Sequence, residues 1–186
     1  MKLKEIIKTS ADLLGLKEIS LFLSGETTDL DQASKEKLDK LIELSNLVIS
    51  ELSCTYVPMV FVEKINVISG KINFTDLKKK ILRVLFIKDE NGNKVDFTCD
   101  YVSANVPNGN IEITYECQSD YVGLDEQTGY KSHQVSKGVL SYGVCAEFCL
   151  TERRFDEAVM WNKRYVDAVK EKIIVKNSRV KSRRWQ

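Results

Sequence analysis

The chain has 186 residues, 43% of them hydrophobic and 30% charged, which suits one folded domain, or one with a small insert, and excludes a wholly disordered chain. Its 28 basic and 27 acidic residues nearly balance, but Lys172–Gln186 holds six basic and no acidic residues, so residues 1–171 carry 22 basic against 27 acidic, a net charge of −5. No apolar run approaches the roughly 18–20 residues that span a bilayer, and the N-terminus lacks a secretory signal's apolar stretch, so we expect intracellular synthesis and no membrane partner.

The first 55 residues carry helical patterns. Residues 2–14 predict one helix that stops at Gly15, and Lys17–Leu23 predicts a helical turn or two. Asp31 is among the candidate N-caps of a longer amphipathic helix of about 20 residues. Its apolar stripe consists of Leu38, Leu41, Ile42, Val48, Ile49 and Leu52.

Residues 56–118 change to β-branched and aromatic runs that are separated by turn signals. The turns are expected at Ser69-Gly70, around Asn91-Gly92 and at Pro107–Gly109. An Asn-Gly pair between two apolar runs is a strong hairpin signal. We therefore predict a small antiparallel sheet of about four or five strands, inserted between helical segments.

The helical pattern returns in residues 119–174, after a polar loop at 119–131. One helix is predicted from near Ser132 to Thr151, and a second from there to about Ile174. The short link between them predicts antiparallel neighbours. The expected buried face of the last helix consists of Phe155, Ala158, Val159, Val166, Val169 and Ile173. The predicted fold is thus α+β: a helical bundle with an inserted antiparallel sheet and an extended basic tail, residues 175–186.

The residues with chemical potential do not form a recognisable catalytic or metal site. The five cysteines are odd in number and widely spaced, which does not suggest a disulfide framework, and Cys145 and Cys149 are interpreted as buried thiols. His133 is the only histidine and does not lie in a ligand pattern with them. We expect no cofactor, no metal and no enzymatic activity.

Two groups of residues are candidates for interactions. Trp161, Arg164 and Tyr165 lie together on the predicted last helix, where they either pack on the preceding helix or form a contact between subunits. The tail is either a solvated end, a nucleic-acid-binding element or a segment that docks on a protein. We favour docking, because Arg and Trp are common anchors in protein interfaces. The candidate docking residues are Arg179, Val180, Lys181, Arg183, Arg184 and Trp185.

Several of these residues also carry a resemblance to a family. Ala158, Trp161, Arg164 and Tyr165 form an AxxWxxRY pattern, which is followed by a tail that ends in Arg183-Arg184-Trp185-Gln186. In this order the two elements resemble the C-terminal half of head–tail connector proteins (adaptor or head-completion proteins) of tailed bacteriophages and prophages of Gram-positive bacteria. The resemblance covers residues 56–186, including the β segment, whereas the first 55 residues match only in helical character.

The resemblance implies a structural protein of the virion neck, made in the bacterial host cytoplasm. Such proteins form a ring, expected to be a dodecamer, beneath the portal protein. The C-terminal tails insert into the portal, other neck or tail proteins bind below, and genomic DNA passes through the channel without specific binding. The alternative from another class is a nucleic-acid-binding or packaging accessory protein that uses the basic tail.

Overall fold

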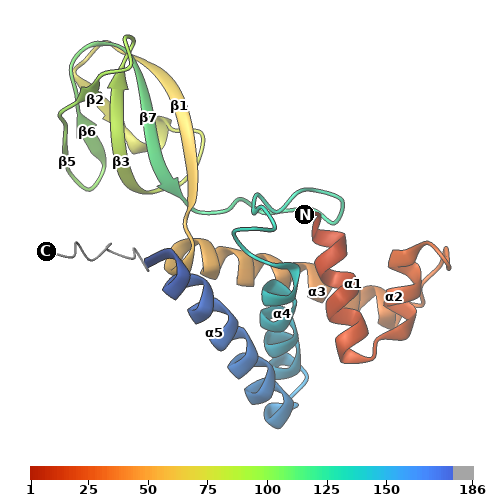
Figure 1. Ribbon diagram of the computed structural model, residues 1–186. Coiled ribbons are helices and arrows are strands. Elements are labelled where there is room, and N and C mark those ends of the chain that lie inside the picture. The colour runs from red at the N-terminus through yellow and green to blue at the C-terminus, as the bar shows by residue number, and fades with distance from the viewer. Residues whose placement is uncertain (178–186) are drawn as a thin grey trace, which may run out of the picture. The chain divides into compact units, whose positions relative to one another are not determined.

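The computed structural model describes the backbone of residues 1–177 and the side chains of residues 1–171. It divides the chain into two compact units (Figure 1). The helical unit consists of Met1–Ile49 together with the residues from Tyr121 onward, and the β unit consists of Ser50–Asp120. The predicted α+β class is confirmed, and the insert expected at residues 56–118 lies within the β unit.

The described α-helices are α1 (Leu3–Leu14), α2 (Lys17–Ser24), α3 (Gln32–Glu51), α4 (Lys137–Thr151) and α5 (Phe155–Asn177), and a π-helical turn at Leu52–Tyr56 follows α3. Two of the predicted helix signals are present in the structure. Gly15 ends α1 in the left-handed conformation with φ of 74°, where glycine carries no steric penalty. Asp31 precedes α3, and its Oδ1 accepts a hydrogen bond from the backbone N–H of Ser34 at 2.9 Å.

The two segments of the helical unit are joined at the start of α1. The backbone N–H groups of Leu3 and Lys4 donate to the carbonyl oxygens of Glu126 and Leu124, at 3.1 and 2.9 Å. The first N–H groups of a helix have no partner within the helix, so the loop before α4 satisfies donors that would otherwise need water. Further along, Ser141 of α4 donates from Oγ to the carbonyl oxygen of Ile6 at 3.3 Å.

Helix α4 begins five residues later than the sequence suggested. The expected start near Ser132 is wrong, because the carbonyl oxygen of Lys131 accepts from the N–H groups of Gln134 and Val135 in a separate turn. Ser136 is the N-cap instead, since its Oγ accepts from the N–H of Val139 at 3.4 Å. The short link to α5 leaves α4 and α5 as packed neighbours, as predicted (Figure 1).

The buried face of α5 agrees with the expected one at Ala158 and Val169 and differs from it elsewhere, and the side chain of Ile173 lies outside the described residues. Phe155 and Val159 were predicted to be buried, but they are 62% and 70% exposed. The described residues that are buried on this helix are Ala158, Trp161, Tyr165 and Val169. The spacing of 3.6 residues per turn places the two sets on neighbouring faces of the helix, so α5 has two apolar stripes. Periodicity alone does not show which of two such stripes the chain covers.

The β unit contains two antiparallel sheets rather than the single sheet of four or five strands that we predicted. One sheet has the order β1 (Met59–Val67), β7 (Gly109–Cys117), β3 (Ile81–Asp89) and β4 (Lys94–Val95). The other has the order β2 (Lys71–Asn73), β6 (Ser103–Asn105) and β5 (Thr98–Cys99). The short polar strands β5 and β6 carry no alternating apolar pattern, which is why the second sheet was missed.

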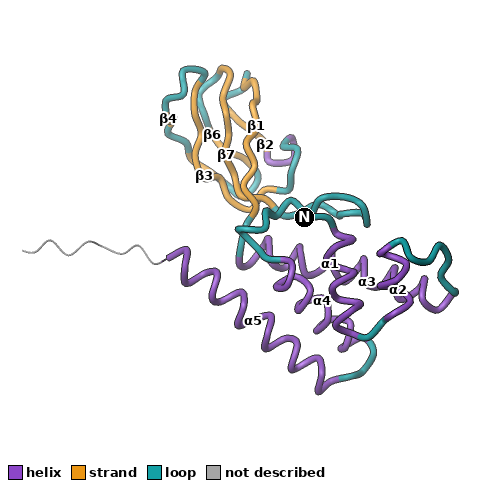
Figure 2. The backbone as a smooth tube through the Cα atoms, turned by 45° about the vertical axis from the view of Figure 1, so that its right-hand side comes forward, coloured by secondary structure: helices purple, strands orange, loops and turns teal. Residues whose placement is uncertain are grey.

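The first and last long strands of the β unit pair with each other. Figure 2 shows both strands in the β unit. The register of β1 and β7 runs without interruption from Met59 opposite Cys117 to Val67 opposite Gly109. The chain therefore enters and leaves the β unit through two paired strands, and the unit has its own apolar core. The buried residues of this core are Val67, Ile72, Leu77, Ile87, Ala104, Val106, Ile111, Ile113, Tyr115 and Cys117.

Candidate interaction surfaces

The candidate docking residues of the tail lie outside the described residues. They are Arg179, Val180, Lys181, Arg183, Arg184 and Trp185. The described backbone of α5 ends at Asn177, directly before this segment. The docking role of the tail therefore stays a prediction.

Trp161 is placed in the interior of the helical unit, where its side chain is held from two sides. Its ring is 6% exposed and stacks on the ring of Tyr142 in α4, with the ring centroids 5.9 Å apart and an interplanar angle of 23°. The guanidinium carbon of Arg164 lies 4.9 Å from the Trp161 ring centroid. A cation at this distance from a Trp ring is attracted by the electron-rich ring face, so Arg164 covers the outer side of the tryptophan.

Tyr165 of α5 packs beside Gly143 of α4, close to Val48 of α3. A Cβ atom added to Gly143 of α4 would lie 3.2 Å from two carbons of the Tyr165 ring and 2.7 Å from Cγ1 of Val48 in α3. Real Cβ atoms almost never approach another heavy atom to 2.7 Å, so only glycine fits here. The absence of a side chain at Gly143 is what allows the tyrosine to pack between the helices.

The AxxWxxRY pattern is thus largely the buried stripe of α5. Ala158, Trp161 and Tyr165 are all less than 7% exposed, as the packing interpretation expected. Of the three candidate subunit-packing residues, Arg164 is the one with an exposed side chain. The contact between subunits stays a prediction, and among these three residues Arg164 is the one whose side chain is exposed to a partner.

Helix α5 has a second apolar surface, which we call the outer stripe and which was not predicted as an exposed surface. It consists of Phe155, Val159 and the half-buried Val166, at a spacing that places all three on one face of the helix. Leu150 at the end of α4 is also 46% exposed. The signal was in the sequence, because residues 155, 159 and 166 repeat with helical spacing just as 158, 161, 165 and 169 do.

The cysteine thiols of α4 are buried and protonated at neutral pH. Burial raises the pKa of Cys145 to about 12 and also raises the pKa of Cys149. A thiol acts as a nucleophile or metal ligand only as a thiolate. Within residues 1–177, no cluster of three or more His, Cys, Asp and Glu side chains is arranged to hold a metal ion. None of the helices in this part of the chain is both long and apolar enough to cross a membrane.

A buried carboxyl group in the β unit accepts two structural hydrogen bonds. Oε2 of Glu63 accepts from the Tyr115 hydroxyl and from the backbone N–H of Lys78, both at 3.1 Å. Burial, followed by the hydrogen bond to Glu63, raises the pKa of Tyr115 to about 12. The phenol therefore stays protonated and keeps donating to Glu63. This pair fixes the segment after β2 to the sheet, which explains the buried carboxyl without a catalytic role.

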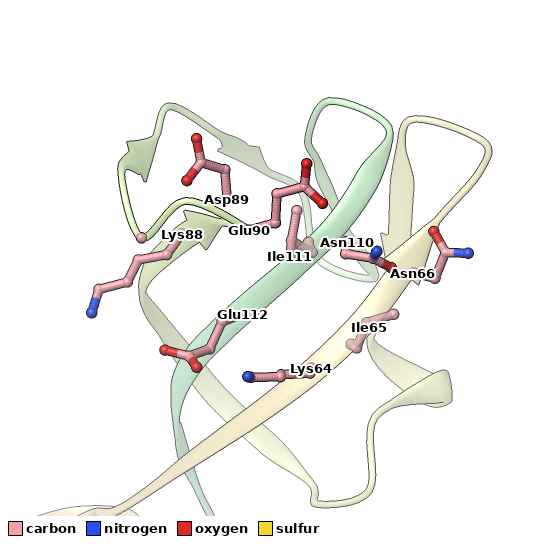
Figure 3. Close-up of a pocket in the computed structure, with 10 residues that line it drawn as sticks. Lys64, Ile65, Asn66, Lys88, Asp89, Glu90, Asn110, Ile111 and Glu112 are labelled. Carbon is pink, nitrogen blue, oxygen red and sulfur yellow. The ribbon is translucent and has the colours of Figure 1, made fainter.

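The outward face of the four-stranded sheet has a shallow hollow of about 600 Å³ beside the β3–β4 turn (Figure 3). Glu112 of β7 lies between Lys64 of β1 and Lys88 of β3, its direct partners in the register of the two neighbouring strands. Asp89 is occupied by the turn, since its Oδ1 accepts from the N–H groups of Asn91 and Asn93. The hollow is therefore lined by charges that compensate one another across the strands, and its geometry does not indicate a ligand.

Comparison with known proteins identified no matching protein-family model and no matching curated protein.

Proposed function

We propose that this protein is a head–tail connector of a tailed bacteriophage, a structural subunit of the virion neck that forms a ring beneath the portal protein. Its C-terminal tail docks into the portal, and the ring continues the DNA channel toward the tail proteins. The protein performs no reaction in this role, and its mechanism is assembly.

The observation that carries this proposal is the separation of charge at the end of α5. The tail that follows this helix collects Arg, Lys and Trp without any acid, whereas residues 1–171 have a net charge of −5. Arg and Trp are the side chains most enriched among the residues that dominate binding at protein interfaces. The pattern that precedes the tail in the sequence supports the proposal further, because its two aromatic residues are buried and Trp161 stacks on Tyr142 of α4, which holds the described part of α5 in place.

The charge of the body also suits a channel through which DNA passes. A net negative body repels the phosphate backbone, so DNA is not retained by nonspecific binding. Docking of a single tail need not be tight, since many tails held in one ring bind with avidity.

The test is co-sedimentation with portal-bearing particles from the same source. The full-length protein is compared with a variant that lacks Val180–Gln186, and with a double substitution, Arg183→Ala with Arg184→Ala. We expect full-length protein to sediment with the particles and both variants to stay in the supernatant. A matched control removes two exposed cations elsewhere, Lys35→Ala with Lys80→Ala, and is expected to sediment normally.

Continued sedimentation of the truncated protein would remove the tail from this account. Failure of the full-length protein to sediment would contradict the connector role itself. The alternative, a nucleic-acid-binding accessory protein, would then be supported by DNA binding at low salt whose affinity falls steeply as salt is raised.

A further inference from the structure

Two strands of the β unit have an edge that the described strands leave largely unpaired. One edge of β3 pairs with β7, but on its other edge β4 covers only Ile87 and Lys88, so Ile81–Phe86 have no described strand beside them on that side. β5 is the last strand of the second sheet and pairs with β6 on one edge only. The N–H and C=O groups along an open strand edge are a template for a further extended segment.

The same two strands line a hollow of about 780 Å³, which we call the edge groove. Its apolar lining comes from the start of β3 and from the residues around β5, and includes Ile81, Leu82, Val84, Phe97, Tyr101 and Val102. Leu82 is 43% exposed, Val102 is 69% exposed and Tyr101 is fully exposed. The volume lies within the range of about 300–1,000 Å³ that is usual for binding pockets. The edge groove therefore combines an open strand edge with uncovered apolar side chains.

The charges at the edge groove favour an acidic occupant. Lys80 and Arg83 line it, and the Arg83 side chain is 69% exposed while it pairs with Glu116 of β7 at 3.1 Å. Asp100 is the one carboxylate among the residues that line the groove. Its Oδ1 accepts from two backbone N–H groups of its own turn, at 2.9 and 2.6 Å, and its Oδ2 accepts from the Ser103 hydroxyl at 2.9 Å. The negative charge is thus compensated locally, whereas the cations are presented to an occupant.

These charges argue against three other occupants. The chain's own tail is basic, since Lys172–Gln186 holds six basic and no acidic residues. A second copy of β3 would bring its own Lys78–Lys80 and Arg83 to the same edge, and the register shifts of β3 interrupt the ladder that long strands form. A nucleic acid requires an excess of positive charge, but the β unit holds eight basic against ten acidic residues.

We propose that the edge groove binds an extended, acidic segment of another protein, which adds a strand to the open edge of β3. In this mode of recognition the main-chain hydrogen bonds give affinity, and alternate side chains of the segment give specificity. Apolar side chains of the segment lie over Leu82 and Tyr101, and its carboxylates reach the long side chains of Lys80 and Arg83. The inference is independent of the proposed function, because it concerns the β unit and does not involve the tail.

Cys99 provides the readout, because its thiol is exposed and lines the edge groove, whereas Cys54 is exposed and lies outside it. The probes are a short peptide that alternates acidic and apolar residues, EVEFEVE, and its basic counterpart, KVKFKVK. Each is added in excess to the full-length protein before a pulse of thiol reagent. Because labelling follows the unoccupied fraction, we expect EVEFEVE to slow labelling of Cys99 by about fivefold at about 80% occupancy. Labelling of Cys54 should not change, and KVKFKVK should protect neither thiol.

A third peptide separates strand addition from contact with the apolar side chains alone. EVEFEVE with N-methyl groups at alternate residues keeps every side chain but loses the backbone donors along one edge. It should leave Cys99 unprotected. Among protein variants, Lys80→Glu should weaken the protection by EVEFEVE about tenfold, since it places a like charge beside the peptide. Lys94→Glu changes an exposed cation of β4 outside the groove and should be protected like the wild type.

Several results would overturn the inference. Equal protection by EVEFEVE and KVKFKVK would contradict the preference for an acidic segment, and protection by the methylated peptide would contradict strand addition. No protection by EVEFEVE at its highest soluble concentration would remove the groove as a docking site. A single-stranded oligothymidylate is the nucleic-acid probe and should leave Cys99 unprotected. Stronger protection by this probe than by EVEFEVE would assign the groove to nucleic acid instead.

Discussion

The two units of this protein are built from the chain in opposite ways. The β unit is one continuous segment that closes on itself, since its first and last long strands pair over their whole length. The helical unit is assembled from two segments that the β unit separates, and its closing contact, from Ser141 to Ile6, joins residues 135 positions apart. Each unit has its own apolar core, so a substitution in one core is expected to leave the other unit folded.

The cysteines offer a direct measure of this independence. Cys117 is buried in the β unit, Cys145 and Cys149 are buried in the helical unit, and Cys54 and Cys99 are exposed. Buried thiols react with a thiol reagent only when their unit opens. Pulsed labelling with mass spectrometry therefore reports the opening of each unit separately, with the exposed thiols as an internal reference.

The largest effect is expected from Trp161→Ala. Removal of a buried tryptophan from a packed core typically costs about 3–5 kcal/mol, and here the stacking on Tyr142 is lost as well. Labelling of Cys145 and Cys149 should accelerate at least a hundredfold, while labelling of Cys117 stays at the wild-type rate. The matched control is Met160→Ala, since Met160 precedes Trp161 and is 41% exposed. Equal acceleration of all three thiols would show that the two units unfold together.

The reciprocal effect is expected from Glu63→Ala in the β unit. The substitution leaves the Tyr115 hydroxyl and the Lys78 N–H without their acceptor in a buried site. Buried groups that lose a partner cost about 1–3 kcal/mol each, so Cys117 should label at least tenfold faster and the α4 thiols should not change. Glu112→Ala, on the outward face of the neighbouring strand, is the control and should label like the wild type. Faster labelling of Cys145 in the Glu63 variant would contradict the independence of the units.

Alkaline pH should lower the stability of the β unit through the titration of Tyr115. Tyr115 has its pKa raised to about 12 in the folded chain, above the ordinary value of 10. Between these values the unfolded chain loses the phenol proton and the folded chain keeps it, so stability is fully present below pH 10 and is lost as pH rises through 12. The difference corresponds to roughly 2–3 kcal/mol.

A comparison with Tyr115→Phe isolates this contribution. Cys145 also has its pKa raised to about 12, so the wild-type protein loses stability in both units on the alkaline side. Between pH 10 and 12 the phenylalanine variant should lose less stability than the wild type in the β unit, as measured by the protection of Cys117 from labelling. In the helical unit the two proteins should lose the same amount. An identical pH dependence in wild type and variant would mean that Tyr115 does not titrate with a raised pKa.

The sequence predicted the helical unit better than the β unit for a physical reason. Helix signals are local: Gly15 and Asp31 mark helix ends within one turn of the residues that they cap. The pairing of β1 with β7 depends on strands some 50 residues apart, and no local pattern specifies it. The hairpin between β3 and β4 was predicted because its signal is local, with Asp89 as acceptor and Gly92 at a φ of 83°.

The candidate site shows the same limit. The spacing of Ala158, Trp161 and Tyr165 predicted a shared helix face, which is buried as the packing interpretation expected. Helical spacing also assigned Phe155 and Val159 to the core, because the pattern reports an apolar stripe without reporting what covers it. The stripe that faces α4 makes contacts that spacing does not report, such as the packing of Tyr165 beside Gly143 and near Val48, which brings together residues of three helices.

The smallest effect is expected from the ion pair that links the two segments of the helical unit. Nζ of Lys40 in α3 lies 2.8 Å from Oε1 of Glu152 at the end of α4, and both side chains are about one-third exposed, at 34% and 36%. Partly exposed pairs contribute about 0.2–1 kcal/mol, screened by salt. A double-mutant cycle of Lys40→Ala and Glu152→Ala should give a coupling energy in that range.

The pair should also weaken on the acid side of neutrality. The hydrogen bond from Lys40 lowers the pKa of Glu152, so the contribution is present above the ordinary glutamate pKa and is lost as pH falls through the lowered value. A coupling energy near zero at acid pH and below about 1 kcal/mol at neutral pH would mean that apolar packing on α1, α4 and α5 holds the two segments together. A coupling of several kcal/mol would instead make this surface pair the main link across the segments, which is difficult to reconcile with its exposure.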